Sequence, residues 1–179
     1  MREYASRLVF SFFVFLMAGC ASPAQKQNMI VDQSALVKEA ENSRFSQSLM
    51  ITSVSGGEET NPLWTSEIDS DAFHGALTDS LKHSGLIAET PEQAKYELRA
   101  ILAKVKQPSI GFNYTVTSDI SYLITEKSSG NLIFEEEIST PYTASLGESI
   151  YGVKRLRLAN EGSIRENIKT FIARILSTE

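Results

Sequence analysis

The sequence has little of what disulfide-linked, metal-dependent and nucleic-acid-binding proteins use. Its 179 residues include one cysteine, so no disulfide can form within the chain. The two histidines, His74 and His83, are separated by about 900° of turn in a helix, so they face opposite sides and do not easily share a metal ion. The formal net charge is −5, which argues against nucleic acid as the main partner.

Near its start, the sequence also lacks a hydrophobic run of about 20 residues, which is the length that a stable transmembrane helix needs. The apolar stretch there covers residues 8–16, follows Arg2 and Arg7, and is followed by the small residues Ala18 and Gly19. A positive start, an apolar middle and small residues before a cleavage point are the layout of a secretory signal. The sequence therefore predicts a signal peptide over residues 1–19.

The segment Leu16-Met17-Ala18-Gly19-Cys20 resembles the lipobox of bacterial lipoproteins. The resemblance implies cleavage before Cys20 and acylation of its thiol, and two or three acyl chains anchor a protein firmly. Ala21 follows, where an aspartate would resemble an inner-membrane retention signal, so the outer membrane is favoured. We expect a lipid-anchored periplasmic protein; the alternative is an ordinary signal peptide with a chance cysteine.

The mature chain divides into a polar segment and one domain. Residues 20–47 carry few large apolar side chains, which predicts a flexible tether with a short helix around Ala35–Glu41. The alternative is that this segment packs on the domain. Residues 48–179 are expected to form a single α+β domain in the periplasm.

Hydrophobic periodicity gives the elements of this domain. Strands are predicted at Leu49–Val54, Tyr96–Lys106, Tyr114–Ile124 and Leu132–Ser139, with Pro141 and Gly147 in a following loop. Helices are predicted at Asp71–Ser84, with Asp69 at the N-cap region and Gly85 after the end, and at about 148–177. In the last helix one apolar stripe holds Ile164, Ile168, Phe171 and Ile175. Gly152 and Gly162 weaken this helix, and one of the two is expected to be a bend or a close-packing point.

The order β-α-β-β-β-α predicts a two-layer α+β sandwich. Apolar and polar residues alternate from Tyr114 to Ile124, so the sheet has one wet face and both helices cover the other. Consecutive hairpins predict a four-stranded antiparallel sheet.

The best candidate for a binding site is the loop that follows the first strand. Gly56 and Gly57 allow positive φ or a close approach of the backbone, and Leu63 and Trp64 are apolar residues in an otherwise polar loop. An exposed Trp64 would be a contact for a protein or lipid. The alternative is that Trp64 covers the end of the core.

A second candidate is the basic group Lys154, Arg155 and Arg157. It would bind a phosphate or an acidic partner, unless it forms salt bridges to the nearby Glu148 and Glu161. The charge run Glu135-Glu136-Glu137 is typical of a solvated strand edge. No catalytic residues, no cofactor and no metal site are predicted.

Two stretches, residues 55–66 (SGGEETNPLWTS) and 152–162 (GVKRLRLANEG), resemble a group of small Gram-negative outer-membrane lipoproteins. The likeness covers about residues 48–176. Members of this group often carry the label of a UDP-N-acetylglucosamine acyltransferase. Such acyltransferases resemble left-handed β-helices built on hexapeptide repeats with a catalytic histidine, and this chain has no such repeats. In the order of its elements alone, the chain is also similar to the lipoprotein that plugs the lipopolysaccharide-assembly barrel.

Three functions follow as hypotheses. The first is a non-enzymatic module that is held at the membrane by the acyl chains on Cys20 and binds an envelope protein or glycolipid. The second is an envelope enzyme acting on a glycan or lipid, as the acyltransferase label implies. The third is a structural partner of a larger outer-membrane complex. Titratable residues converging in a pocket would favour the second, and an exposed apolar patch the first or third.

Overall fold

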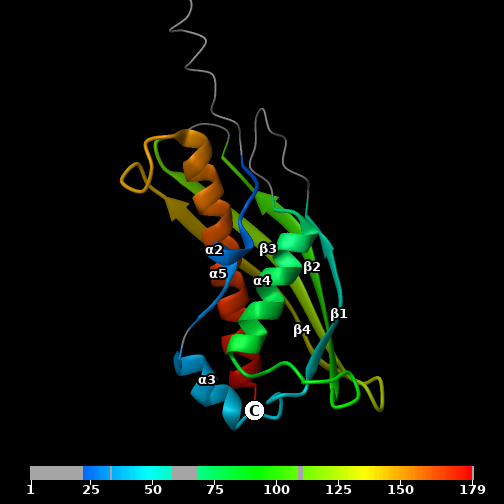
Figure 1. Cartoon of the computed structure of the whole chain (residues 1–179). Coiled ribbons are helices and arrows are strands. Elements are labelled where there is room, and N and C mark those ends of the chain that lie inside the picture. Colours follow the sequence, from blue (N-terminus) through cyan, green and yellow to red (C-terminus); the bar gives the residue numbers. More distant parts are fainter. Residues whose placement is uncertain (1–21, 33, 58–67, 109–110, 179) are drawn as a thin grey trace, which may run out of the picture.

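The computed structural model describes residues 22–32, 34–57, 68–108 and 111–178, so the predicted signal peptide and Cys20 lie outside the described part. No helix in these ranges has the length and apolar character needed to cross a bilayer. The elements, labelled in Figure 1, are α2 (Lys26–Met29), α3 (Ser34–Glu41), β1 (Leu49–Gly56), α4 (Ser70–His83), β2 (Tyr96–Lys106), β3 (Tyr114–Glu126), β4 (Leu132–Ala144) and α5 (Gly152–Ser177).

The four strands form one sheet in the order β1-β2-β3-β4. β2, β3 and β4 are antiparallel neighbours, as predicted, but β1 runs parallel to β2, with Leu49 opposite Tyr96. The expectation of a fully antiparallel sheet was wrong for this one pair. Because α4 lies between β1 and β2 in the chain, the connection crosses over the sheet and returns the chain in the same direction.

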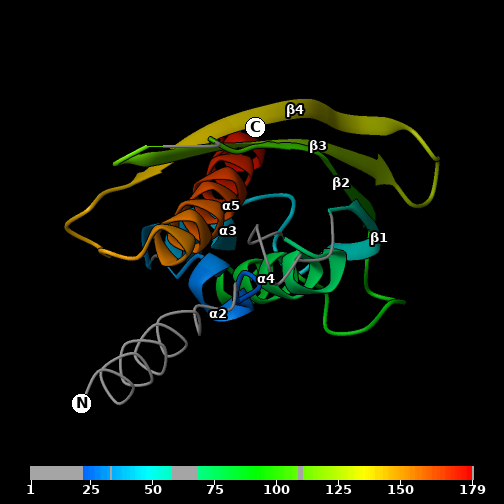
Figure 2. The same ribbon diagram turned by 90° about the horizontal axis from the view of Figure 1, so that it is seen from above.

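The helices cover one face of the sheet, which confirms the α+β sandwich. Figure 2 shows the sheet curving over α5, with α4 beneath β1 and β2. The predicted stripe of α5 is fully buried in the core, where Phe171 stacks on Tyr122 of β3 with ring centroids 4.0 Å apart. Asp69 caps α4, since its Oδ1 accepts the Ala72 N–H at 2.6 Å, as the sequence predicts.

β4 extends further than predicted. Pro141, expected in a loop, lies inside the strand opposite Thr117, and pairing continues to Ala144 opposite Tyr114. Proline lacks an N–H, but an edge strand has a neighbour on one side only, so the missing donor can face solvent. β4 is such an edge.

The segment before β1 is packed on the domain, which corrects the prediction of a flexible tether. Met29, Val31, Leu36, Ala40 and Phe45 all belong to the hydrophobic core. Polar contacts hold the segment as well: Lys26 Nζ lies 2.8 Å from Asp79 Oδ2 of α4, and the Val31 N–H donates to Ser80 Oγ at 2.9 Å. In Figure 2, α2 lies against α4 and α5 on the side turned away from the sheet. The sheet covers one side of α4 and α5, and the segment before β1 covers part of their opposite side.

Candidate functional site

The two glycines singled out in the sequence are fixed by close backbone contacts at the end of β1. Gly56 has φ +80° and Gly57 has φ +87°, a conformation that favours glycine. A Cβ atom on Gly56 would lie 2.1 Å from the Leu102 carbonyl oxygen of β2, and one on Gly57 would lie 2.5 Å from the Ile68 carbonyl oxygen. Both the positive φ and the close approach predicted for these glycines are therefore present.

A pocket of about 500 Å³ lies beside these glycines. It is lined by Gly56, Gly57, Ile68, Leu102, Ala103, Lys104, Val105 and Gln107. The last residue pair of β1 and β2 is Gly56 with Leu102, yet β2 continues to Lys106 and pairs there with β3. The register of β2 shifts between Leu102 and Lys104, where Ala103 is the extra residue. Within the described ranges, the end of β2 thus has a strand neighbour on one side only.

Leu63 and Trp64, the apolar residues of the same loop, lie outside the described residues. Their proposed contact role stays a prediction. The histidines, His74 and His83, are both exposed on α4, and no group of three potential metal ligands is found in the described part of the chain.

The predicted basic group does not form one open cationic surface, because its three side chains have different environments. Lys154 is exposed. Arg155 is only 5% exposed, and its Nη1 donates to the carbonyl oxygens of Ser149 at 2.8 Å and Ile150 at 3.0 Å. The Arg155 guanidinium also lies over the Tyr114 ring, 5.1 Å from its centroid. Arg155 therefore holds the loop between β4 and α5 in place.

Arg157 is engaged as the alternative in the sequence predicts. Its Nε lies 3.6 Å from Oε1 of Glu161, one turn further along α5. Glu161 is almost completely buried and also accepts the Gln25 N–H at 2.8 Å and Asn28 Nδ2 at 2.9 Å. Glu161, paired with Arg157, thus fixes Gln25 and Asn28 of the N-terminal segment to α5.

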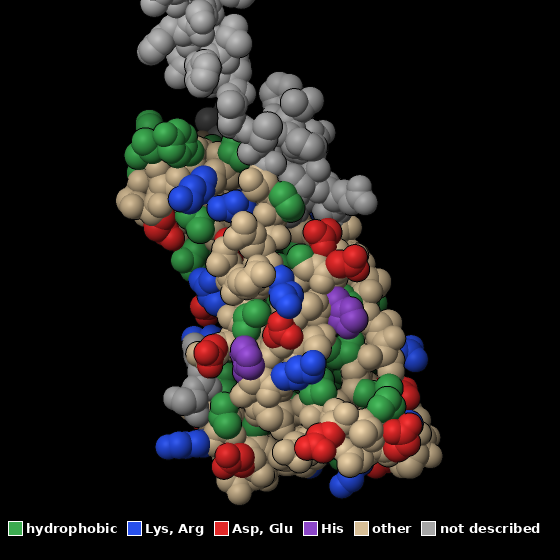
Figure 3. Space-filling model, viewed as in Figure 1, with side chains coloured by type: hydrophobic (Ala, Val, Ile, Leu, Met, Phe, Trp, Pro, Cys, Tyr) green, Lys and Arg blue, Asp and Glu red, His purple; other side chains and the backbone are tan. Residues whose placement is uncertain are grey.

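The loop held by Arg155 presents two of the three most exposed large apolar side chains among the described residues. Figure 3 shows hydrophobic side chains gathered at this end of the molecule, over the start of α5. Ile150 is 76% exposed and Tyr151 71%, whereas typical apolar side chains of this size are covered. Phe112 lies just before the Tyr114–Ala144 pair, at the same end of the sheet. We call the following set the apolar tip: Phe112, Leu146, Ile150, Tyr151 and Val153.

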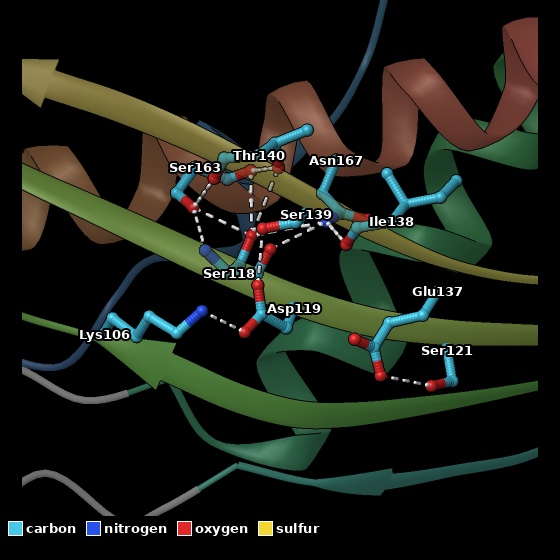
Figure 4. Close-up of polar contacts among 10 residues, drawn as sticks. All are labelled: Lys106, Ser118, Asp119, Ser121, Glu137, Ile138, Ser139, Thr140, Ser163 and Asn167. Atoms are coloured by element: carbon cyan, nitrogen blue, oxygen red, sulfur yellow. Dashed lines mark hydrogen bonds and ion pairs between the residues drawn. The ribbon is translucent and has the colours of Figure 1, made fainter.

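A buried polar network, which sequence reasoning missed, connects α5 to β3 and β4 (Figure 4). Ser163 Oγ accepts the Ser118 N–H at 2.9 Å and lies 2.9 Å from the Thr140 carbonyl oxygen. Asn167 Nδ2 donates to the carbonyl oxygens of Ser118 at 3.1 Å and Ile138 at 2.7 Å. The adjacent Gly162 allows this close contact, because a Cβ there would lie 2.3 Å from the Tyr142 ring. Gly162 is thus a close-packing point.

The titratable groups beside this network have structural partners. Burial raises the pKa of the Tyr122 phenol well above its usual range, so its hydroxyl stays protonated and donates to Asn167 Oδ1 at 3.0 Å. On the other face of β3, hydrogen bonds from Lys106 and then Ser139 lower the pKa of the Asp119 carboxyl. Lys106 Nζ lies 2.7 Å from Asp119 Oδ2. The network can support the contact of helix and sheet, and each of its groups has a partner.

No protein-family model and no curated protein matches this chain. Its fold is similar to those of several solved structures, all with low sequence identity. A protein of the DUF330 family from Xanthomonas campestris is 12% identical, with a TM-score of 0.57 over 74% of this chain and 85% of that one. A minor lipoprotein from Acinetobacter baumannii is 12% identical, with a TM-score of 0.53 over 74% of this chain and 94% of that one. A hypothetical protein from Chlamydia trachomatis is 10% identical, with a TM-score of 0.51 over 74% of this chain and 99% of that one.

Proposed function

We propose that the protein is a lipid-anchored lipoprotein at the periplasmic face of the outer membrane and that it binds an extended segment of another envelope protein without catalysing a reaction. The anchor is Cys20, on the evidence of the lipobox, and the binding surface is the side of the end of β2 that has no strand neighbour among the described residues. The likeness of fold to a minor lipoprotein supports the first part by analogy only.

One observation carries the binding proposal: β2 extends beyond the end of β1. β1 stops pairing at Gly56, while β2 continues to Lys106, and the pocket of about 500 Å³ opens beside the residues in between. A strand edge of this kind offers backbone N–H and C=O groups to an added strand, and the pocket gives a place for a side chain of that strand. Lys104 is exposed beside it and suits an acidic residue in the partner.

The structure gives less support to the hypothesis of an envelope enzyme than to the binding hypothesis. The fold is an open four-stranded sheet rather than the β-helix of the acyltransferases to which the label refers. Ser163 and Tyr122, which carry hydroxyl groups, are fully buried and hydrogen-bonded inside the contact of α5 with the sheet. They are therefore out of reach of a glycan or lipid substrate.

The anchor is tested by the replacement Cys20→Ala. We expect the variant to lose all incorporation of a palmitate analogue and to leave the membrane fraction, because the chain has no other cysteine to acylate. The measurement is metabolic labelling followed by separation of inner and outer membranes. Label that persists in the variant would contradict the anchor, and label of the wild type in the inner membrane would contradict the location.

The binding surface is tested with a photo-crosslinking amino acid at Ala103, which is exposed at the end of β2. We expect a discrete adduct with one protein in intact cells. The matched control carries the same amino acid at Ser128, which is exposed in the turn between β3 and β4, and should give no such adduct. Lys104→Glu should reduce the adduct at position 103 severalfold, with an unchanged melting temperature. Equal adducts at both positions, or none at Ala103, would contradict the proposed surface.

A further inference from the structure

We infer that the apolar tip inserts into the interfacial region of the phospholipid bilayer that carries the anchor, so that the domain is seated on the membrane in one orientation. The inference rests on the proposed anchor at Cys20. It adds a second contact with the membrane, made by the folded domain itself.

The composition of the tip suits a bilayer interface. Phe112 is 79% exposed, and with Ile150 and Tyr151 it presents two aromatic rings and a branched aliphatic chain to solvent. Aromatic side chains with a polar end, such as tyrosine, are enriched at the level of the lipid headgroups. Lys154, exposed next to Val153, can extend its ammonium group toward headgroup phosphates while its methylene groups lie along the apolar residues.

The loop that presents these side chains is held by its own hydrogen bonds. Glu148 Oε2 accepts the Ser145 N–H at 2.7 Å, and the Tyr151 N–H donates to Ser149 Oγ at 3.2 Å. The buried Arg155 binds the carbonyl oxygens of Ser149 and Ile150 from below. Because the buried side chain of Arg155 holds this loop by hydrogen bonds, the fold itself determines that Ile150 and Tyr151 are exposed to solvent.

The length of chain between the anchor and the domain brings the membrane to this end. Gln25 is fixed to Glu161 through its backbone N–H, and Glu161 lies about 14 Å along α5 from Gly152 at a rise of 1.5 Å per residue. From Gln25 back to Cys20 the chain spans at most about 17 Å. Figure 1 shows residues 22–25 running from α2 toward the end of the molecule where α5 begins. A chain of this length allows the acylated residue to reach the level of the apolar tip and little further.

A bilayer explains these facts better than a protein partner does. Because the N-terminal segment is packed on the domain, little free chain is left between the anchor and the domain. The domain therefore cannot move far from the membrane. The residues of the apolar tip lie at the end of the molecule that the short connection brings to the bilayer. A protein partner could cover the tip, but it would not require this coincidence of the tip with the anchor.

The test uses the lipidated protein in vesicles of phosphatidylethanolamine and phosphatidylglycerol. Because the thiol of Cys20 carries a lipid, Ile150→Cys provides the one thiol that can be labelled with an environment-sensitive fluorophore. The matched control is Leu132→Cys, since Leu132 is 54% exposed at the start of β4, at the opposite end of the sheet. We expect a blue-shifted emission with severalfold greater intensity at position 150 only, and quenching there by brominated lipids. Adding Tyr151→Asp should reverse the shift.

The outcomes separate the anchor from the tip. If the protein fails to float with the vesicles, the anchor is wrong and the inference falls with it. If it floats and both labels report water, the anchor stands and the insertion of the tip is overturned. If the label at position 150 is already shielded in the soluble Cys20→Ala form without vesicles, a second copy of the chain covers the tip, and the inference is again overturned.

Discussion

Replacement of Ile168 by alanine is expected to lower the free energy of unfolding by about 2–5 kcal/mol, the range for truncating a buried isoleucine. Ile168 is completely buried in the main core, on the apolar stripe of α5. Alanine has the higher helix propensity, so a loss of stability comes from the cavity and the lost burial of apolar surface, not from the helix itself.

Urea unfolding of the purified domain measures this effect. Lys169→Ala is the matched control, because the neighbouring lysine is partly exposed and makes a 3.6 Å ion pair with Glu166. Such a pair contributes about 0–1 kcal/mol. A loss below about 1 kcal/mol for Ile168→Ala, or an equal loss for both variants, would show that Ile168 is not in the core.

Asn167→Ala is expected to destabilise the domain by a comparable amount for a different reason. The variant loses the bonds from Asn167 Nδ2 to the Ser118 and Ile138 carbonyl oxygens and leaves the buried Tyr122 hydroxyl without its acceptor. Each buried polar group left unpaired costs about 1–3 kcal/mol, so we expect a total loss of about 3 kcal/mol or more.

A double-mutant cycle with Tyr122→Phe tests the cause. In the wild-type background, loss of the Tyr122 hydroxyl should cost about 1 kcal/mol, the net value of a hydrogen bond. In the Asn167→Ala background the same replacement removes an unpaired hydroxyl and should raise stability. The change of sign is the diagnostic result. Equal costs of Tyr122→Phe in both backgrounds would contradict the hydrogen bond to Asn167.

Local patterns in the sequence predicted most of the sheet and both long helices. The alternation from Tyr114 to Ile124 is a property of one strand, and the stripe of Ile164 to Ile175 is a property of one helix, so each can be recognised without knowing its partners. The direction of β1 depends on which strand it joins after α4, and its own residues do not encode that choice. Pro141 was misplaced because the tolerance of an edge strand for proline depends on the order of strands in the sheet.

The candidate site was predictable only in part. The glycines at the end of β1 were recognised because glycine itself signals unusual backbone geometry. The role of Arg155 was not, because its acceptors are backbone carbonyls, which have no signature in the sequence. The polar network did leave a signal: Ser118 interrupts the apolar side of β3, and Ser163 and Asn167 lie one turn apart beside the apolar stripe. Polar residues in buried positions of two elements are expected to pair with one another.

The contact of Gln25 with Glu161 constrains the order in which the chain can complete its fold. The two residues are 136 positions apart, and synthesis delivers the N-terminal one first. Gln25 and Asn28 therefore lack their acceptor, Glu161, until α5 has been made, whereas the contacts of the same segment with α4 need only earlier parts of the chain. The hairpin of β3 and β4 has no such delay, since its partners are close in the sequence. The attachment of Gln25 and Asn28 to α5 is thus among the last contacts that can form as the chain is made, and until then this segment is open to non-native association.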